Sequence, residues 1–467
     1  MKKHISAAGG RAPRLLAALT ALLLLLPLAA GCGGGAGAVT ASPDDTQVPA
    51  ADTQAAGDTS AGTETGEPGE TASPEVTTQA PVTTEKPAVT TSPEVTTQAP
   101  VTTEKPAVTT SPEVTTQAPV TTEKPAVTTS PEVTTQASGG SHFRFTAPPS
   151  SFRFTQETVC TNTIDRSSYP AFFAGATSTG ITVPALPQYF VPQGMDYWEE
   201  AEVFFISGYF NPTTYYSTSV LFAVELATGD YVGEWRILDK NGSPHTGHDG
   251  GVAVTGHDIW LATSAKLFRI PLDDVKATGG TGDLRITQEV SVPVRASYCN
   301  YSDGMLWVGE FSLQGNSSYT ITGHDHGSNH AWTLGYRLGP DGTPEADPAC
   351  VISTPEKIQG WTVLDDGRLF MTCSYGRTNN SKLYVSKAPL LSDANRGGTV
   401  RVGGKEIPLY VTGTLTDVTA PPMTEGCCVA CGEPHILFES GAYYYRDYST
   451  NKAKDPTDRI WKFSVNG

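Results

Sequence analysis

The feature that most constrains the fold is a strand–turn–strand pattern that recurs five times in the C-terminal part of the chain. The five runs are QGMDYWEEAEVFFIS, GGVAVTGHDIWLATS, SYCNYSDGMLWVGE, QGWTVLDDGRLFMTCS and EGCCVACGEPHILFE, and they begin at Gln193, Gly250, Ser297, Gln359 and Glu425. Each run reads as a short strand, a tight turn and an apolar strand, and four of the five open with a residue followed by glycine. Because no long segment has helical periodicity, the pattern predicts an all-β domain.

Further strands follow several of these runs, which turns each run into a larger repeating unit. The predicted third strands begin at Ser219, Lys266, Thr333 and Lys382. Repeated units of three or four antiparallel strands are typical of β-propeller blades, so we expect a propeller of five blades. A sixth blade could lie in residues 141–190, and a pair of β-sandwiches is the alternative fold. The run Arg459–Val465 is predicted as the outer strand of the last blade. A segment near Phe152–Cys160 could pair with this strand and close the ring.

At the level of blade pattern, the domain resembles the secreted propellers of the gluconolactonase and strictosidine-synthase-like group. The resemblance covers the C-terminal domain only and consists of architecture, without a diagnostic catalytic motif. A fold shared at this level does not carry over a catalytic residue, and none is assigned from it.

The N-terminal residues 1–31 have the pattern of a secretion signal. A basic start is followed by the apolar run Leu15–Leu28, which ends in Ala29-Ala30-Gly31-Cys32. Small residues before a cysteine resemble the lipobox of bacterial lipoproteins, which implies lipidation of Cys32 and anchoring at the extracellular face of the cell membrane. The alternative is an ordinary signal peptide followed by a cysteine that carries no lipid.

Residues 32–140 are predicted to be a disordered stalk. A 19-residue unit, SPEVTTQAPVTTEKPAVTT, begins at Ser73, Ser92 and Ser111 and restarts at Ser130. Its apolar side chains are only Val and Ala, which cannot bury a core, and its prolines favour an extended chain. We expect the stalk to hold the domain of residues 141–467 away from the membrane. The many threonines beside proline also permit O-glycosylation.

Charge and cysteine content restrict the partners of the chain. The formal net charge is −17, and the domain has no basic stripe, so nucleic acid is not an expected partner. We expect a monomer. The cysteines Cys427, Cys428 and Cys431 crowd together, but a strand would place their side chains on alternating faces, so zinc is not favoured. A disulfide between Cys299 and Cys350 is a further expectation.

Antiparallel pairing predicts where the functional loops lie. The loops after the second strands must lie on the face where the first strands begin, because each first strand is connected to its second by a tight turn. These loops are long and rich in aromatic residues, and function concentrates on long loops of a rigid scaffold. The tyrosines expected to contact a ligand are Tyr209, Tyr215, Tyr216, Tyr443 and Tyr444. The alternative is that they pack the loops against one another.

Polar residues at the strand ends should converge on the same face, around the mouth of the channel. The expected neutral or ligand-binding contacts are Gln193, Ser297, Gln359 and Glu439. The candidate metal ligands are Asp249, Glu310 and Glu425, which with His248 are also the candidate catalytic residues. Oxygen ligands of this kind suit Ca²⁺, and paired carboxyl groups also suit acid–base chemistry. The structural alternative is that these side chains only bind water and the strand backbone.

A histidine cluster in the loop after Glu310 is a weaker metal candidate. It consists of His324, His326 and His330, and two imidazoles spaced by one residue can reach one ion from an extended loop.

Two functions of the domain stay open from the sequence. One is a module that binds a glycan, a peptide or a small molecule at the channel mouth, and it is preferred because it needs no coincidence of reactive groups. The other is a metal-assisted extracellular hydrolase, similar to lactonases or phosphoesterases.

Overall fold

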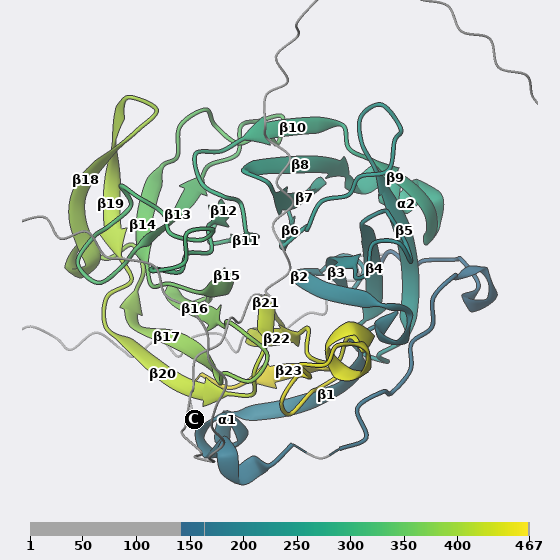
Figure 1. Ribbon diagram of the computed structural model, residues 1–467. Helices are drawn as coiled ribbons and strands as arrows, with labels where there is room; N and C mark the ends of the chain where they lie inside the picture. Colours follow the sequence, from purple (N-terminus) through teal and green to yellow (C-terminus); the bar gives the residue numbers. More distant parts are fainter. Residues whose placement is uncertain (1–141, 163, 466–467) are drawn as a thin grey trace, which may run out of the picture. The chain divides into compact units, whose positions relative to one another are not determined.

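The computed structural model describes residues 142–162 and 164–465 of the chain, and all structural statements below concern this part. Five sheets surround a common centre, and each is built on four antiparallel strands (Figure 1). The prediction of an all-β propeller with five blades is therefore confirmed. No sixth blade lies in residues 142–190, which contribute short helical turns, the helix α1 (Pro170–Gly175) and one strand. The predicted signal peptide, the predicted stalk and Cys32 lie outside the described residues.

The strands are named by their place in the blades. The five innermost strands are β2 (Phe190–Trp198), β6 (Gly251–Val254), β11 (Tyr298–Ser302), β15 (Ile358–Val363) and β21 (Thr424–Ala430). The second strands are β3 (Val203–Phe210), β7 (Asp258–Thr263), β12 (Met305–Gly309), β16 (Arg368–Cys373) and β22 (Glu433–Phe438). The third strands are β4 (Val220–Glu225), β8 (Lys266–Pro271), β13 (Ala331–Tyr336), β17 (Ser381–Pro389) and β23 (Arg459–Phe463). The outer strands are β5 (Tyr231–Leu238), β10 (Gln288–Ser291), β14 (Cys350–Thr354), β20 (Leu415–Ala420) and β1 (Ala176–Thr182).

Two blades are extended at their outer edge by segments inserted in the following blade. Strand β9 (Thr281–Arg285), which follows the helix α2 (Leu272–Thr278), pairs in parallel with β5. The hairpin of β18 (Arg396–Val402) and β19 (Lys405–Val411) pairs in parallel with β14. These additions cover edges that would otherwise present unpaired backbone groups. No helix in the described residues has the length and apolar character needed to cross a membrane.

The ring is closed by a strand from the start of the domain. Strand β1 pairs antiparallel with β23, so that the first and last strands of the described chain share one blade (Figure 1). The predicted closure by Phe152–Cys160 is wrong, and β23 is the third strand of its blade rather than the outer one. The segment before β1 instead packs Phe154 on Phe210 and Phe222 of the neighbouring blade, because its aromatic side chains fill the space between blades.

The hydrophobic core is divided into five clusters, one between each pair of adjacent blades. Cys299 packs into the cluster on one side of its blade, and Cys350 packs into the cluster on the other side. The predicted disulfide between them is therefore wrong, and both are free thiols. Cys427 and Cys428 likewise face two different clusters.

Glycines allow the inner strands to approach closely at one level of the channel. A Cβ on Gly251 would lie 2.1 Å from the backbone nitrogen of Cys299 in the next blade. A Cβ on Gly194 would lie 2.6 Å from the nitrogen of Val252. Gly360 and Gly426 face the next inner strand in the same way. This close packing of backbones explains why four of the five runs have glycine at their second position.

Candidate functional site

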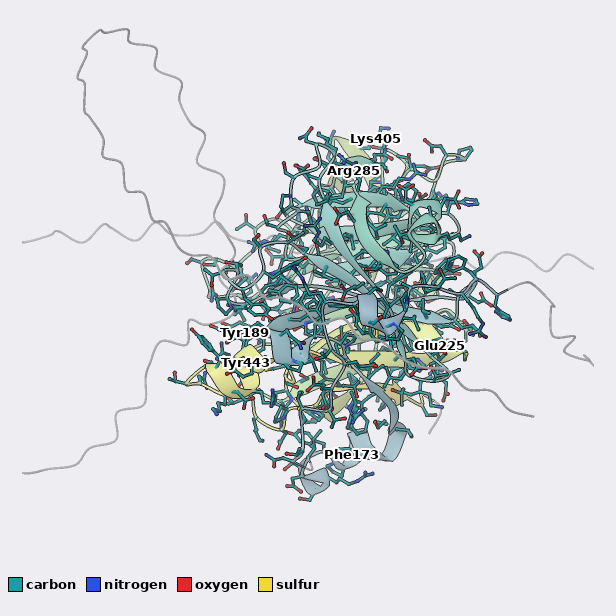
Figure 2. All side chains as sticks on the ribbon, turned by 90° about the vertical axis from the view of Figure 1, so that its right-hand side faces the viewer. Phe173, Tyr189, Glu225, Arg285, Lys405 and Tyr443 are labelled. Carbon is teal, nitrogen blue, oxygen red and sulfur yellow. The ribbon has the colours of Figure 1, made fainter. Side chains whose placement is uncertain are left out.

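The two ends of the channel differ in the segments that surround them. Phe190 at the start of β2 pairs with Phe210 at the end of β3, so the long loops after the second strands lie where the inner strands begin. This end is called the long-loop face, and the other end, at the tight turns, is called the turn face. Figure 2 shows Tyr189 and Tyr443 together on one edge of the domain and Glu225, the last residue of β4, on the opposite edge.

The floor of the long-loop face contains a pair of carboxyl groups. Glu425 on β21 and Glu439, directly after β22, share a side-chain hydrogen bond. The amide of Gln193 donates to Glu439 over 3.0 Å, and the amide of Gln359 donates to Glu425 over 3.3 Å. All four side chains come from strand ends that the sequence predicts to converge, and the structure brings them into one network.

The two carboxyl groups have strongly perturbed acidity. Burial raises the pKa of Glu425 well above its ordinary value, and the adjacent charge of Glu439 raises it further. Burial also raises the pKa of Glu439, to about 7, while its hydrogen bonds act in the opposite direction. Two carboxylates in contact cannot both be charged without a large cost, so one proton is shared between them near neutral pH.

Aromatic and basic side chains surround this pair. The hydroxyl groups of Tyr209 and Tyr445 lie 3.4 Å apart, and Tyr445 also hydrogen-bonds Glu439. The guanidinium of Arg377 lies 4.7 Å from the ring centre of Tyr445. The ring of His248 lies against Tyr209, with 4.3 Å between ring centres. Burial lowers the pKa of His248 to about 4, so its imidazole is neutral at physiological pH.

The other two predicted carboxylates each have a histidine partner. Asp249 contacts Nε2 of His245 at 2.9 Å, and Glu310 contacts Nδ1 of His324 at 2.5 Å. Burial alone would lower the pKa of His245, but the charge and hydrogen bond of Asp249 outweigh it and raise the pKa. Sequence reasoning selected His248 and missed His245, because only His248 directly precedes the carboxylate.

These pairings do not fit the predicted calcium site. Glu310 also accepts from the backbone nitrogen of Trp332, and Asp249 is only 1% exposed. Among the described residues, no three His, Cys, Asp or Glu side chains are grouped so as to hold a metal ion. The carboxylates of Asp249, Glu310 and Glu425 are thus each engaged with protein groups instead of facing one common point.

The predicted histidine cluster is separated in the same way. The His324 ring stacks on Trp332, with 3.7 Å between ring centres, and Nδ1 of His324 contacts the carboxylate of Glu310. His330 pairs with Asp325 at 2.6 Å, and His326 takes part in a short backbone bridge with Asn329. Ser297, a further predicted contact, accepts a hydrogen bond from the backbone of Phe311.

A cluster of tyrosines forms the rim of the long-loop face. Tyr189 contacts Tyr215, Tyr443 and Tyr448, with 4.9, 4.7 and 5.9 Å between ring centres. Tyr444 stacks on Tyr448 at 5.7 Å. Among the described residues, Tyr215 and Tyr448 are the large hydrophobic side chains that stand exposed, at 47% and 56%. The cluster of Tyr189, Tyr215, Tyr443, Tyr444 and Tyr448 is called the tyrosine rim below.

Sequence reasoning identified Tyr215, Tyr443 and Tyr444 of the rim and did not include Tyr189, and Tyr216 lies elsewhere. Tyr216 packs between Phe154 and Phe210 and lies under the guanidinium of Arg153, so it serves the packing of its loop. Tyr189, which joins the rim together, was missed because it precedes β2 instead of following a second strand. A sequence signal for Tyr189 is available, because it follows the turn at Pro187-Gln188 and directly precedes an apolar strand.

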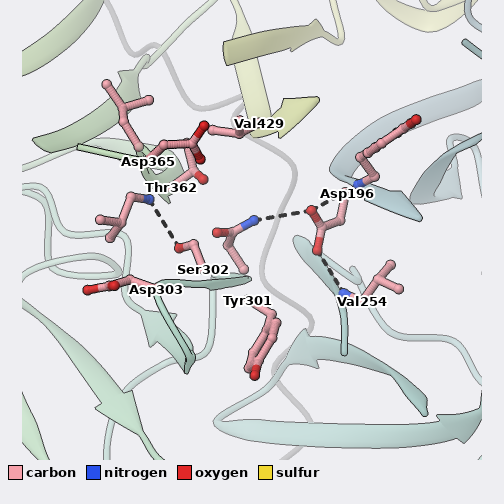
Figure 3. A pocket seen from close by; sticks show the side chains of 12 residues that line it. Asp196, Val254, Tyr301, Ser302, Asp303, Thr362, Asp365 and Val429 are labelled. Carbon is pink, nitrogen blue, oxygen red and sulfur yellow. Dashed lines mark hydrogen bonds between the residues drawn. The ribbon is translucent and has the colours of Figure 1, made fainter. Parts of the chain in front are cut away.

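A separate cavity opens at the turn face. Its volume is about 400 Å³, and Figure 3 shows Asp196, Thr362 and Val429 around it. Asp196 and Thr362 come from inner strands, as does Asn300, which also lines the cavity. Sequence reasoning missed this site because it considered only the strand ends at the long-loop face. The signal was present, since all three residues are the fourth of their run.

Comparison with solved structures finds distant propellers. An aldose sugar dehydrogenase from Streptomyces coelicolor, in its PQQ-bound form, is 14% identical over 58% of this chain and 93% of its own, with a TM-score of 0.35. The glutaminyl cyclase of Myxococcus xanthus is 11% identical over 59% and 91%, with a TM-score of 0.31. A putative gluconolactonase is 13% identical over 62% and 92%, with a TM-score of 0.27. The propeller assignment rests on the strand pairing described above.

At the level of sequence, no protein-family model matches the chain, and no curated protein matches it.

Proposed function

We propose that this chain is a cell-surface binding protein whose long-loop face recognises oligosaccharides. The observation that carries the proposal is the tyrosine rim, in which the two exposed rings, Tyr215 and Tyr448, both contact Tyr189. Soluble domains seldom expose neighbouring large aromatic rings without a partner for them. Flat tyrosine faces with a polar edge suit the apolar faces and the hydroxyl groups of sugar rings.

The floor beside the rim supplies the polar groups that a sugar requires. The rim reaches the carboxyl pair through Tyr444, which contacts both Tyr448 and Tyr445. The neutral imidazole of His248 and the oxygens of Glu439, which shares one proton and one negative charge with Glu425, offer hydrogen-bond donors and acceptors near this point. Directional contacts of this kind suit the hydroxyl groups of sugars.

The geometry of the carboxyl pair differs from that of a glycosidase. Glycosidases hold their two carboxyl groups about 5 Å apart when they retain configuration and roughly 6.5–9.5 Å apart when they invert it. Glu425 and Glu439 are joined by a hydrogen bond, so they lie closer together than either of these separations. Hydrolysis remains the second candidate, because a carboxyl pair with raised pKa values is a feature of acid–base sites.

The proposed location rests on the N-terminal sequence. We propose that lipidated Cys32 anchors the chain at the extracellular face of the membrane and that the Thr/Pro repeats carry the propeller outward. A propeller carried on such a stalk would meet glycans in the surroundings of the cell.

The testing experiment is isothermal titration of the domain with cello-, xylo- and chito-oligosaccharides, with product analysis of the same mixtures. We expect saturable binding of one class without turnover. Tyr215→Ala should weaken this binding about tenfold, which corresponds to roughly 1.4 kcal/mol. Tyr410→Ala, which alters a half-buried tyrosine on the outer strand β19, is the matched control and should leave it unchanged. Absence of binding throughout the panel, or release of products, would overturn the proposal.

A further inference from the structure

The cavity at the turn face is a polar site of its own. Its volume of about 400 Å³ falls within the range of small-molecule sites, roughly 300–1,000 Å³. It lies at the opposite end of the inner strands from the carboxyl pair, beyond the level where Gly194 and Gly251 bring the strands together. A ligand bound here would therefore not occupy the long-loop face.

Asp196 is held in the cavity with one fixed orientation. Its Oδ2 accepts from the backbone nitrogen of Val254 over 2.7 Å, and its Oδ1 accepts from its neighbour Tyr197 over 2.9 Å. The side-chain amide of Asn300 donates to the same Oδ1 over 3.3 Å, so the carboxyl group bridges two inner strands (Figure 3). All these partners are donors, which is the arrangement that suits an ionised carboxylate.

Asn300 leaves a buried acceptor without a partner. The residue is 1% exposed, and its Oδ1 has no hydrogen bond within the described chain. Because its nitrogen must face the carboxylate of Asp196, its oxygen is the atom that remains for the cavity. A buried polar atom without a partner is costly, unless a donor from outside the chain binds to it.

The charge of the lining points to the kind of donor. Asp303 and Asp365 lie at the rim of the cavity, and no Lys or Arg is among the residues that line it. Burial raises the pKa of Asp196 to about 7, despite the opposing hydrogen bonds from the backbone of Val254, Tyr197 and Tyr301. A cation in contact with this carboxyl group would favour its charged form.

We infer that the turn-face cavity binds the ammonium group of a small organic amine. The ammonium donates to the carboxylate of Asp196 and to Oδ1 of Asn300, while the rim carboxylates of Asp303 and Asp365 lie near its positive charge. An ammonium group has three donors and no acceptor, which matches a lining whose unsatisfied atom is an acceptor. This site is independent of the oligosaccharide proposal, because the two use opposite faces.

The experiment uses 1,4-diaminobutane as the probe, 1,4-butanediol as its neutral counterpart and calcium chloride as the competing cation. Titration calorimetry on the full chain should give saturable binding of the diamine and at least tenfold weaker binding of the diol. Asp196→Asn keeps the size of the side chain and should weaken diamine binding at least tenfold. Asp230→Asn, an exposed change elsewhere on the turn face, should leave it unchanged.

A second variant covers the case in which Asp196→Asn does not fold. Asp365→Asn alters an exposed rim residue and should weaken diamine binding at least twofold in a domain with the parent melting temperature. Equal binding of diamine and diol would overturn the inference, as would calcium binding that excludes the diamine. Absence of diamine binding to the parent, or unchanged binding to a folded Asp196→Asn variant, would also overturn it.

Discussion

Glu425 and Glu439 share a hydrogen bond at the floor of the long-loop face, where a strand residue and a loop residue hold one proton between them. The pair joins the innermost strand of the last blade to the loop that carries most of the tyrosine rim. Its protonation state is therefore coupled to the folded state of the domain, because both pKa values exceed those of glutamate in an unfolded chain.

The raised pKa values predict the direction in which the stability of the domain changes with pH. A carboxyl group whose folded pKa is raised contributes stability below the unfolded pKa of about 4.3, and this stability is lost as the pH rises through the folded pKa. Glu425→Gln replaces the protonated carboxyl with an amide of similar shape. The stability of the variant relative to the parent should therefore rise between pH 5 and pH 8, by about 1–3 kcal/mol.

The measurement is thermal unfolding of both proteins from pH 5 to pH 8. The two proteins are compared with each other at every pH, because the raised pKa of Asp196 and the lowered pKa of His248 make the stability of both depend on pH in this range. A stability difference that does not change with pH would contradict the shared proton.

The close approach of the inner strands makes a second prediction. Gly251→Ala would bring a Cβ to 2.1 Å from the Cys299 backbone, and backbone cannot move aside as a flexible side chain can. We expect a loss of about 3 kcal/mol or more in the free energy of unfolding. Gly256→Ala lies in the turn of the same hairpin with open space around it, so it should change the stability by less than about 0.5 kcal/mol. Equal effects of the two changes in denaturant titration would refute the packing described here.

The proposed anchor is tested in cells. Cys32→Ala removes the thiol that would carry the lipid, so we expect the chain to be released into the medium or to remain unprocessed. Fractionation of membrane and medium measures the outcome. Membrane retention equal to that of the parent would argue against lipidation.

The blades could be predicted from the sequence because each carries its own local pattern. The run from Gln193 predicted both β2 and β3, since turn residues separate two apolar segments there. The same alignment brought Gln193, Gln359 and Glu425 to equivalent strand ends, which the structure joins in one network. Positions that follow from the strand period and the turn are local information, and a single sequence contains it.

The features of the fold and the site that could not be predicted depend on contacts between segments that are distant in the sequence. Strand β1 has the mostly polar sequence ATSTGIT, so nothing in its own pattern distinguishes it as the strand that closes the ring. The link between Asp196 and Asn300 spans two blades and is visible only once the curvature of the ring is known. The partners of Asp249 and Glu310 were missed for a related reason, because loop conformation determines which histidine reaches each carboxylate.

The central claim is that the tyrosine rim binds sugar by stacking, and the most direct test compares two changes at its most exposed ring. Tyr448→Phe keeps the aromatic face, and Tyr448→Ala removes it. For the oligosaccharide that the parent domain binds, titration calorimetry should give a Kd within about twofold of the parent for Tyr448→Phe and about tenfold weaker for Tyr448→Ala. Unchanged affinity in the alanine variant, or equal losses in both, would contradict stacking on this rim.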